Sequence, residues 1–473
     1  MNPIDAFMVV VIILNLTYLY FWGVAAFAIS KGHIDRTAVS NKEIGRLLKR
    51  RLKSRHPILF VIQITTKGGS VAVVRRGIEY AIKAVGKYPI LKHVVSVEVI
   101  TEEMEDKLAL DREFADAPIP VTTYILPADY QTPNGTQLKA RALHYMVEIH
   151  RQTPRNSYIV HYDEESVFTE DNLARLVRNL LKKPLGISEG SISYPLEWED
   201  SHIMCRTMES SRPFGCHECY LMMTNPAPLH LHGSNLVVQE RLENKIGWDI
   251  GTLGDKPLIA EDLVFGLMFF LKFGKKSFGW HGVEMIEQPP FTVKAAYKQR
   301  ERWVLGALQG VAHVRSLPEW KKLSLGERIK IQLVIRLRVL TYAIGLPVSI
   351  ISLVLLMFYV GYNFTSFLIG TEALNPLTIA AIPGLAMWLG ANQIGLWQNL
   401  RYTKKNVPQK LLEHAKVLVM TPFSGLFDTA GPAVASIKWL FGVRGMAWIP
   451  TPKAVGQKFE ERTNSLVVEG DIA

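Results

Sequence analysis

The most constraining feature of this sequence is the gathering of its apolar residues into long uncharged stretches towards the two ends of the chain. Residues Ala6 to Ser30 contain no charged side chain, and the run Phe7–Ile29 is long enough to cross a bilayer core of roughly 30 Å. No basic residue precedes Lys31, which argues against a cleaved signal peptide. The segment 31–55 then holds nine Lys or Arg against two acids. We therefore predict a transmembrane helix within 1–30, with the N-terminus outside and the basic linker 31–55 in the cytosol.

The last third of the chain contains the other apolar stretches. The basic, amphipathic segment 314–338 predicts a helix lying on the cytosolic headgroups. The region 339–400 predicts two transmembrane helices, Val339–Tyr362 and Leu377–Leu400, joined by a stretch without Lys or Arg. Pro and Gly residues interrupt 401–445, so we expect two interfacial or re-entrant helices there and a cytosolic C-terminal segment over 446–473.

Charge and cysteine usage narrow the class further. The formal net charge is +11, but the basic residues concentrate beside the apolar stretches, which favours membrane topology over nucleic-acid binding. Three cysteines cannot build a disulfide framework, which fits a reducing cytosolic location. We therefore expect an integral membrane protein whose middle part faces the cytosol and binds no nucleic acid.

The middle part, 56–313, alternates β-rich runs with amphipathic helical patterns. Strands are expected at Pro57–Ile64, Val94–Ile100, Val121–Leu126 and Tyr158–His161. Helices are expected between and after them at Val71–Val85, Gln137–His150 and Glu170–Leu181. Such alternation predicts an α/β domain with a mainly parallel sheet whose ligands bind at the carboxyl ends of the strands.

Clusters of acidic and polar side chains fall where these strands should end. Glu102 and Glu103 follow the second strand, and Asp163-Glu-Glu165 follows the fourth. Three carboxylates at the end of a buried strand are costly unless a cation compensates them, and oxygen ligands suit Mg²⁺ or Mn²⁺ bridging a diphosphate. A solvated acidic loop is the alternative. Glu261-Asp262 opens a helix, and Gln299-Arg-Glu-Arg302-Trp303 follows it about forty residues later.

The ordered combination of these motifs resembles glycosyltransferase family 2, whose members are inverting enzymes of the Rossmann-like GT-A fold. The closest likeness is to the egghead-type β-1,4-mannosyltransferases. The resemblance covers roughly residues 57–312 and rests on six stretches: Lys139–Tyr145, Ile159–Glu165, His232–Asn235, Ala260–Asp262, Pro290–Thr292 and Gln299–Trp303.

The resemblance implies a role for each motif. Asp163 and Glu165 would hold Mg²⁺ or Mn²⁺, Asp262 would be the general base, and Glu261 would help to position the base or the acceptor. The donor nucleotide would meet Thr65, Thr66, Glu102 (or Glu103), Lys139, Arg141, Asp163, Gln299 and Arg302. The sugar and the acceptor would meet His232, Gly233, Ser234, Asn235 and Trp303.

Two departures from the wider family concern the acids. The residue that meets the nucleoside is usually Asp, whereas here Glu102 or Glu103 must serve. The metal triplet is Asp-Glu-Glu in place of Asp-x-Asp, although the longer side chain of Glu165 still reaches a metal. Near the C-terminus, Trp448-Ile-Pro-Thr451-Pro-Lys453 looks like the gating-loop motif that closes over the donor diphosphate in membrane family-2 synthases.

The pair Cys216-His-Glu-Cys219 raises the question of zinc. Structural zinc sites usually have a second, regularly spaced pair of ligands, which this sequence lacks, so we expect a mobile loop on the acceptor side with incidental thiols.

The expected activity is transfer of a hexose from a nucleotide sugar to a lipid-linked or membrane-associated acceptor, with a β-linkage as the product. The likeness favours mannose from GDP-mannose, and a UDP-sugar remains open. A processive UDP-sugar-dependent polysaccharide synthase is the first alternative, but it normally needs more membrane helices. A non-catalytic nucleotide-sugar-binding scaffold is the second, and the presence of every expected carboxylate argues against it.

Overall fold

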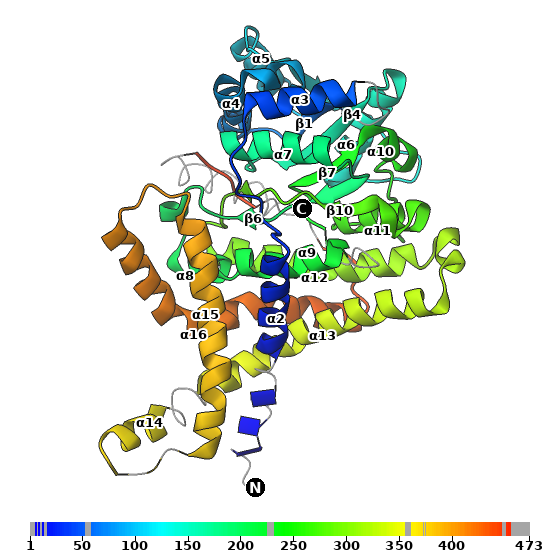
Figure 1. Cartoon of the computed structure of the whole chain (residues 1–473). Helices are drawn as coiled ribbons and strands as arrows, with labels where there is room; N and C mark the ends of the chain where they lie inside the picture. Colours follow the sequence, from blue (N-terminus) through cyan, green and yellow to red (C-terminus); the bar gives the residue numbers. More distant parts are fainter. Residues whose placement is uncertain are drawn as a thin grey trace.

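The computed structural model describes residues 5–6, 8–9, 12–13, 17–52, 58–224, 231–354, 361–371, 373, 375–446 and 451–455. An α/β domain forms the upper part of the molecule in Figure 1, and long helices lie beneath it. The central sheet has seven strands in the order β10-β5-β7-β4-β1-β2-β3. These are β1 (Leu59–Thr65), β2 (Val95–Thr101), β3 (Val121–Ile125), β4 (Ser157–Asp163), β5 (Ile187–Glu189), β7 (Leu236–Gln239) and β10 (Phe278–Trp280).

The sheet is mainly parallel, which confirms the predicted fold class. Strands β3, β2, β1 and β4 pair in parallel, as do β5 and β10, whereas β7 runs antiparallel to both of its neighbours. Two small sheets complete the domain: β6 (Ile192–Ser193) with β11 (Met285–Ile286), and β8 (Thr252–Leu253) with β9 (Lys256–Pro257). All four strands expected from the sequence are present, with shifted ends.

Helices cover both faces of the sheet. On one face, side chains from β1, β2 and β4 form a core with α3 (Asn41–Arg51), α4 (Val71–Lys87), α5 (Met104–Glu113) and α7 (Glu170–Lys182). On the other face, α6 (Leu138–Gln152) and α11 (Glu261–Phe273) pack on β5 and β7. Burial on both faces explains why these strands read as continuous apolar runs. The remaining helices of the domain are α8 (Ile203–Ser210), α9 (Arg212–Thr224), α10 (Glu240–Ile246) and α12 (Val293–Val314).

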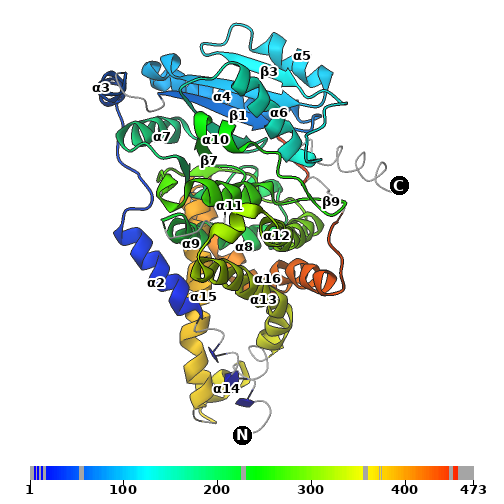
Figure 2. The same ribbon diagram turned by 90° about the vertical axis from the view of Figure 1, so that its right-hand side faces the viewer.

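Beneath the domain lie α2 (Thr17–Ser30), α13 (Leu325–Val354), α14 (Gly361–Leu368), α15 (Pro376–Leu400) and α16 (Val407–Leu440). Among the described residues, α13, α15 and α16 are long and apolar enough to cross a membrane. Helix α2 covers only part of the predicted N-terminal span, because several residues before Thr17 lie outside the described ranges. Figures 1 and 2 show α2 and α15 descending from the domain, while α13 and α16 run across them beneath α12.

Two expected boundaries differ from the structure. The basic segment before Arg338 and the apolar segment after it form one continuous helix, α13, because no helix-breaking residue separates them. The two interfacial helices expected over 411–443 are a single helix, α16, which contains both Pro422 and Pro432. Hydroxyl side chains near these prolines donate to carbonyls of their own helix, such as Thr421 to Val417 (2.7 Å) and Ser436 to Pro432 (2.9 Å). The helix packs on α12 and α13, and such neighbouring helices help a helix to continue through proline.

Candidate active site

A cleft of about 2100 Å³ lies where the carboxyl edge of the sheet meets the lower helices. Its upper wall includes Thr65, Glu102 and Asp163, at or just after the ends of β1, β2 and β4. Its lower wall includes Leu337 and Asn392, from α13 and α15. The cleft therefore connects the ends of the parallel strands with the apolar helices, as expected for ligands that bind at this edge of an α/β sheet.

Strands β1 and β4 bring the first polar groups of the site together. In their parallel register Thr65 pairs with Asp163, so both strands end at the same level. The Thr65 hydroxyl is buried and, within the described part of the chain, has no hydrogen-bond partner. The Thr66 hydroxyl donates to Glu164 (2.7 Å). Burial raises the pKa of Glu164 above its ordinary value.

Two lysines approach the acidic cluster from different parts of the chain. Lys139, near the start of α6, pairs with Asp163, and Lys453 pairs with Glu165. Burial raises the pKa of the Asp163 carboxyl, but the charge of Lys139 and its hydrogen bond outweigh this and hold that pKa below its usual value. Burial lowers the pKa of Lys453 to about 8. The buried carboxylates of this cluster are therefore stabilised by positively charged groups.

Asp262 has the pKa expected of a base at neutral pH. It lies in the first turn of α11, where its carboxylate accepts a hydrogen bond from the Leu263 amide (2.8 Å). Burial, helped by the negative charge of Glu261, raises the pKa of Asp262 to about 7. A carboxyl with such a pKa can accept a proton near neutral pH.

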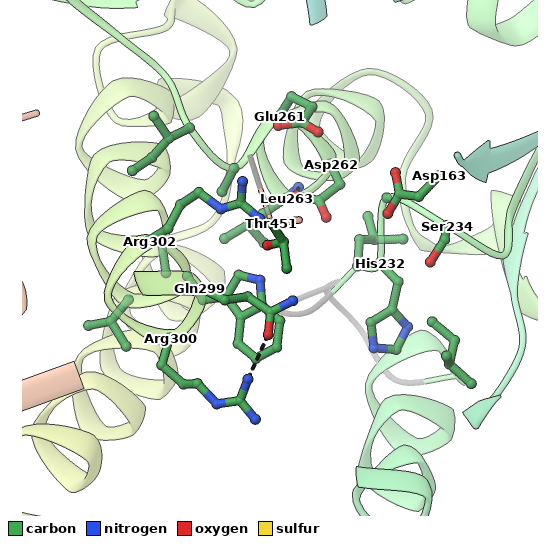
Figure 3. Close-up of a pocket in the computed structure, with 18 of the residues that line it drawn as sticks. Asp163, His232, Ser234, Glu261, Asp262, Leu263, Gln299, Arg300, Arg302 and Thr451 are labelled. Carbon is green, nitrogen blue, oxygen red and sulfur yellow. Dashed lines mark hydrogen bonds between the residues drawn. The ribbon is translucent and has the colours of Figure 1, made fainter. Parts of the chain in front are cut away.

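Gly233 shows how closely the acids converge. A methyl carbon added there would lie 3.2 Å from Lys139 Nζ, 3.5 Å from Asp262 Oδ2 and 3.9 Å from Asp163 Oδ1. The expected base and the expected metal ligand therefore face one small volume beside the Gly233 backbone, as Figure 3 shows for Asp163 and Asp262. A residue without a side chain leaves that volume open.

Helix α12 contributes Gln299, Arg302 and Trp303 to the cleft. The neighbouring Arg300 is buried and donates to Gln299 (2.6 Å, Figure 3) and to Asp428 of α16 (2.8 Å), and it also pairs with Glu209 of α8. The guanidinium of Arg212 lies 4.4 Å from the ring centre of Trp303. A cation therefore covers part of the indole surface that the sequence assigned to a sugar or acceptor.

The segment 232–235 is split between two environments. His232, Gly233 and Ser234 line the cleft, whereas Asn235 is not among the lining residues. Asn235 is fully buried in a left-handed conformation (φ 57°), and its amide donates to the carbonyls of Ser191 (2.8 Å) and Val283 (3.2 Å). Its contacts join the residue before β7 to the segments that follow β5 and β10, and its side chain is turned away from the cleft.

The remaining expected residues are Glu102 or Glu103, Thr451 and Lys453. Glu102 lines it and pairs with Arg141 (3.2 Å), while Glu103 is not among the lining residues and packs over Gly68. Thr451 and Lys453 also line the cleft. The backbone amide of the adjacent Ala454 donates to Gln288 (3.4 Å), whose own amide donates back to the Ala454 carbonyl. Trp448, the aromatic residue of the expected gating motif, lies outside the described residues.

Comparison with known families agrees with this geometry. Residues 158–391 match the model of the family described as glycosyl transferase family group 2. The match runs from β4 through the Glu261-Asp262 pair and α12 into α15. The chain contains a glycosyltransferase family 2 domain.

Individual relatives of the glycosyltransferase domain are found among animal proteins. The chain is 30% identical over 209 residues to the β-1,4-mannosyltransferase egh of Drosophila melanogaster, covering 43% of this chain and 44% of that one. It is 28% identical over 194 residues to the β-1,4-mannosyltransferase bre-3 of Caenorhabditis elegans, covering 40% of this chain and 41% of that one. The chain thus matches less than half of the length of these relatives.

Two solved structures have weaker similarity. The mannosyltransferase PcManGT from Pyrobaculum calidifontis, solved in complex with GDP-Man and Mn²⁺, has 13% identity and a TM-score of 0.48, with 93% of this chain and 99% of that chain covered. Residues 1–349 of S. aureus TarS, solved in complex with UDP-GlcNAc, have 11% identity and a TM-score of 0.34, with 81% and 92% covered.

The carboxylates at and just after the end of β4 could act as ligands for a hard divalent cation. Asp163 and Glu165 supply carboxylate oxygens, the ligand type that Mg²⁺ and Mn²⁺ prefer. Both are paired with lysine ammonium groups, so this pocket stabilises positive charge beside the carboxylates.

Sequence reasoning missed several polar residues that line the cleft, among them Glu287, Gln288 and Arg212. Glu287 is buried and accepts a hydrogen bond from Ser166 (2.7 Å), and its burial, together with the charge of Asp163, raises its pKa to about 7. Arg212 covers Trp303, and Gln288 holds the C-terminal segment. Arg212 belongs to none of the stretches that carry the family resemblance. Glu287 and Gln288 are adjacent and are separated by one proline from the Pro290–Thr292 stretch of that resemblance, which was the signal that could have identified them.

Proposed function

We propose that this protein is an inverting glycosyltransferase that moves a hexose, with mannose from GDP-mannose favoured, onto a lipid-linked acceptor at the cytosolic face of a membrane. The observation that carries the proposal is the convergence of Asp163, Asp262 and Lys139 around Gly233 inside a cleft that reaches the apolar helices. The likeness to the β-1,4-mannosyltransferases egh and bre-3 favours mannose and a β-1,4 linkage.

The donor diphosphate would bind at the acidic end of the cleft. Asp163 and Glu165 would hold Mg²⁺ or Mn²⁺. The bound ion would neutralise the negative charge that grows on the departing diphosphate. Lys139, Arg302 and Lys453 line this part of the cleft and add positive charge. Thr65, Thr66 and Glu102, with Arg141 as its partner, lie where the nucleoside would rest.

The acceptor hydroxyl would be activated by Asp262. With a pKa of about 7, this carboxylate can take the proton as the oxygen attacks the anomeric carbon, which is worth roughly 10²–10⁴-fold in rate. A single direct displacement inverts the anomeric centre, so an α-linked donor gives a β-linked product. Glu261 would orient the acceptor, and Gln299 with Trp303 would border it.

The membrane helices favour an acceptor that stays attached to lipid. Tyr20, Leu337, Trp388 and Asn392, from α2, α13 and α15, line the same cleft as Asp262. The basic residues after α2 and after α15 favour a cytosolic catalytic domain and an external N-terminus.

The test is a panel of nucleotide sugars incubated with the full chain in detergent and a membrane lipid extract. We expect release of GDP from GDP-mannose that depends on the extract and on Mg²⁺ or Mn²⁺, together with a mannosylated lipid. Faster release from a UDP-sugar would overturn the donor assignment. Polymer formed from donor alone would favour a processive synthase, and no release from any donor would contradict the enzyme.

A further inference from the structure

A second group of metal-binding side chains lies beside the cleft, apart from the acidic cluster. It consists of Cys216 and Cys219 on α9 and His232 on the loop before β7. One ligand atom from each residue lies within 4.8 Å of the other two. The thiols are three positions apart on one helix and therefore face the same way. Both are buried, and all three residues line the cleft.

The orientation of His232 distinguishes this group from a chance meeting of thiols. Its Nε2 lies 3.9 Å from the Cys219 sulfur. Its Nδ1 pairs with Glu189 of β5, a fully buried carboxylate that also accepts the backbone amide of His232 (3.2 Å). In Figure 3 the ring points away from Asp163 and Asp262. A carboxylate on one ring nitrogen fixes the tautomer that presents the other nitrogen to a metal.

We infer that Cys216, Cys219 and His232 form a zinc site, with Glu189 as the residue that positions the histidine. Two thiolates and an imidazole are ligands that Zn²⁺ binds well, and such ligands around a tetrahedral ion lie about 3.5–3.8 Å apart. Three protein ligands leave one position, which water from the cleft can fill. On binding, the two thiols, and the imidazole where it is protonated, release their protons to solvent.

The sequence argued against zinc because it has no second regularly spaced pair of ligands. The structure supplies the third ligand from a loop that the sequence assigned to the sugar, and supplies its carboxylate partner from β5, 43 residues earlier in the chain. The other thiol, Cys205, lies on α8 in a separate apolar cluster with Met204 and Met208.

Zinc here would hold the loop that carries Gly233. Cys216 and Cys219 belong to α9, which packs on α2 and α15, whereas Gly233 lies beside Asp262 and Lys139. The ion would therefore link the lower helices to the loop that faces the acids. This inference does not require the proposed sugar transfer, because metal binding can be measured without donor or acceptor.

The test uses metal-stripped full chain in detergent, titrated with Co²⁺ as a spectroscopic substitute for Zn²⁺, in excess Mg²⁺ that occupies the oxygen-ligand site. We expect one Co²⁺ per chain, with the sulfur-to-cobalt absorption of a thiolate site, and its displacement by one Zn²⁺. The double variant C216S/C219S should lose this absorption, and the matched control C205S should keep it. E189Q should weaken binding by about 10–100-fold, the effect typical of losing the partner of a metal-bound histidine.

A second measurement on the unmodified chain covers the case in which the double variant fails to fold. Zn²⁺ should protect Cys216 and Cys219, but not Cys205, from thiol alkylation followed by mass spectrometry. Absence of the thiolate absorption in the unmodified chain, its persistence in folded C216S/C219S, or equal alkylation with and without Zn²⁺ would each overturn the site.

Discussion

Asp262 is the residue on which the proposed chemistry most depends. Replacing its carboxylate by an amide removes the proton acceptor while keeping the shape of the side chain and its hydrogen bond to the Leu263 amide. We expect D262N to lower the rate of sugar transfer by about 10²–10⁴-fold and to leave donor binding nearly unchanged. Steady-state rates and equilibrium binding of the donor measure the two effects. D255N, which alters an exposed aspartate between β8 and β9, is the matched control; equal activity of the two variants would remove Asp262 from the mechanism.

The elevated pKa of Asp262 predicts a pH profile. A base works only when deprotonated, and burial raises this pKa to about 7, so protonation begins as the pH falls through neutrality. We expect kcat/KM to decline about tenfold per pH unit below pH 7 and to level off above it. Initial rates between pH 5 and 9 provide the measurement, with stability monitored in parallel. A profile that stays flat down to pH 5 would contradict the assignment.

At the scale of residues, sequence patterns found the acids because carboxylates at strand ends stand out against apolar runs. The sequence could not show that Ser234 lines the cleft and Asn235 does not, because this difference depends on the left-handed backbone of Asn235, which directs its side-chain amide into the protein. Nor could it show that Arg300, which lines the cleft as Arg302 does, is buried in ion pairs with α8 and α16. Those outcomes depend on which helices pack against α12.

At the scale of elements, Arg300 ties three helices together. Its guanidinium joins α12 to Glu209 of α8 and Asp428 of α16, and both Arg300 and Glu209 are buried. R300M would remove the nearer counter-ion of the buried Glu209 and leave it only the 3.5 Å ion pair with Arg212, so we expect a loss of about 3 kcal/mol of stability, the lower end of the range for breaking a buried ion pair. Thermal unfolding in detergent should show a clearly lower midpoint. The control R315M, at the exposed end of α12, should change stability by less than about 0.5 kcal/mol.

Helix α15 reaches the catalytic domain through a glycine. A methyl carbon at Gly395 would lie 1.9 Å from the Ser210 carbonyl oxygen at the end of α8. We expect G395A to force these helices apart and to cost about 1–3 kcal/mol. G86A in α4 adds the same atom where no heavy atom lies within 4 Å, and should be neutral or stabilising by up to about 1 kcal/mol. Equal unfolding midpoints for the two variants would show that the close approach is not required.

Helix boundaries could be predicted where the helical spacing of apolar residues and the residues flanking it indicated the same position, as at the starts of α4, α7 and α11. The prediction failed for α16, because local rules treat Pro422 and Pro432 as ends of helices. In the folded chain this helix packs on α12 and α13. These tertiary contacts maintain a helix that the sequence pattern interrupts.

At the scale of the whole molecule, the basic flanks predict a definite orientation. If 31–55 and the α/β domain face the cytosol, protease added to sealed right-side-out vesicles should leave the domain intact, and the same protease should digest it in inverted vesicles. Immunoblotting of the protected fragments measures this, and detergent-opened vesicles serve as the control. Digestion in right-side-out vesicles alone would reverse the proposed topology.

The site also has a consequence for biosynthesis, because its parts come from distant positions in the chain. Thr65 is among the first residues of the domain to leave the ribosome, and Lys453, which pairs with Glu165, is among the last of the described residues. The ion pair between Lys453 and Glu165 can form only after α13, α15 and α16 have been synthesised. A nascent chain stalled before α16 would therefore carry Glu165 without its lysine counter-ion, and translation would have to pass Lys453 before the first catalytic cycle.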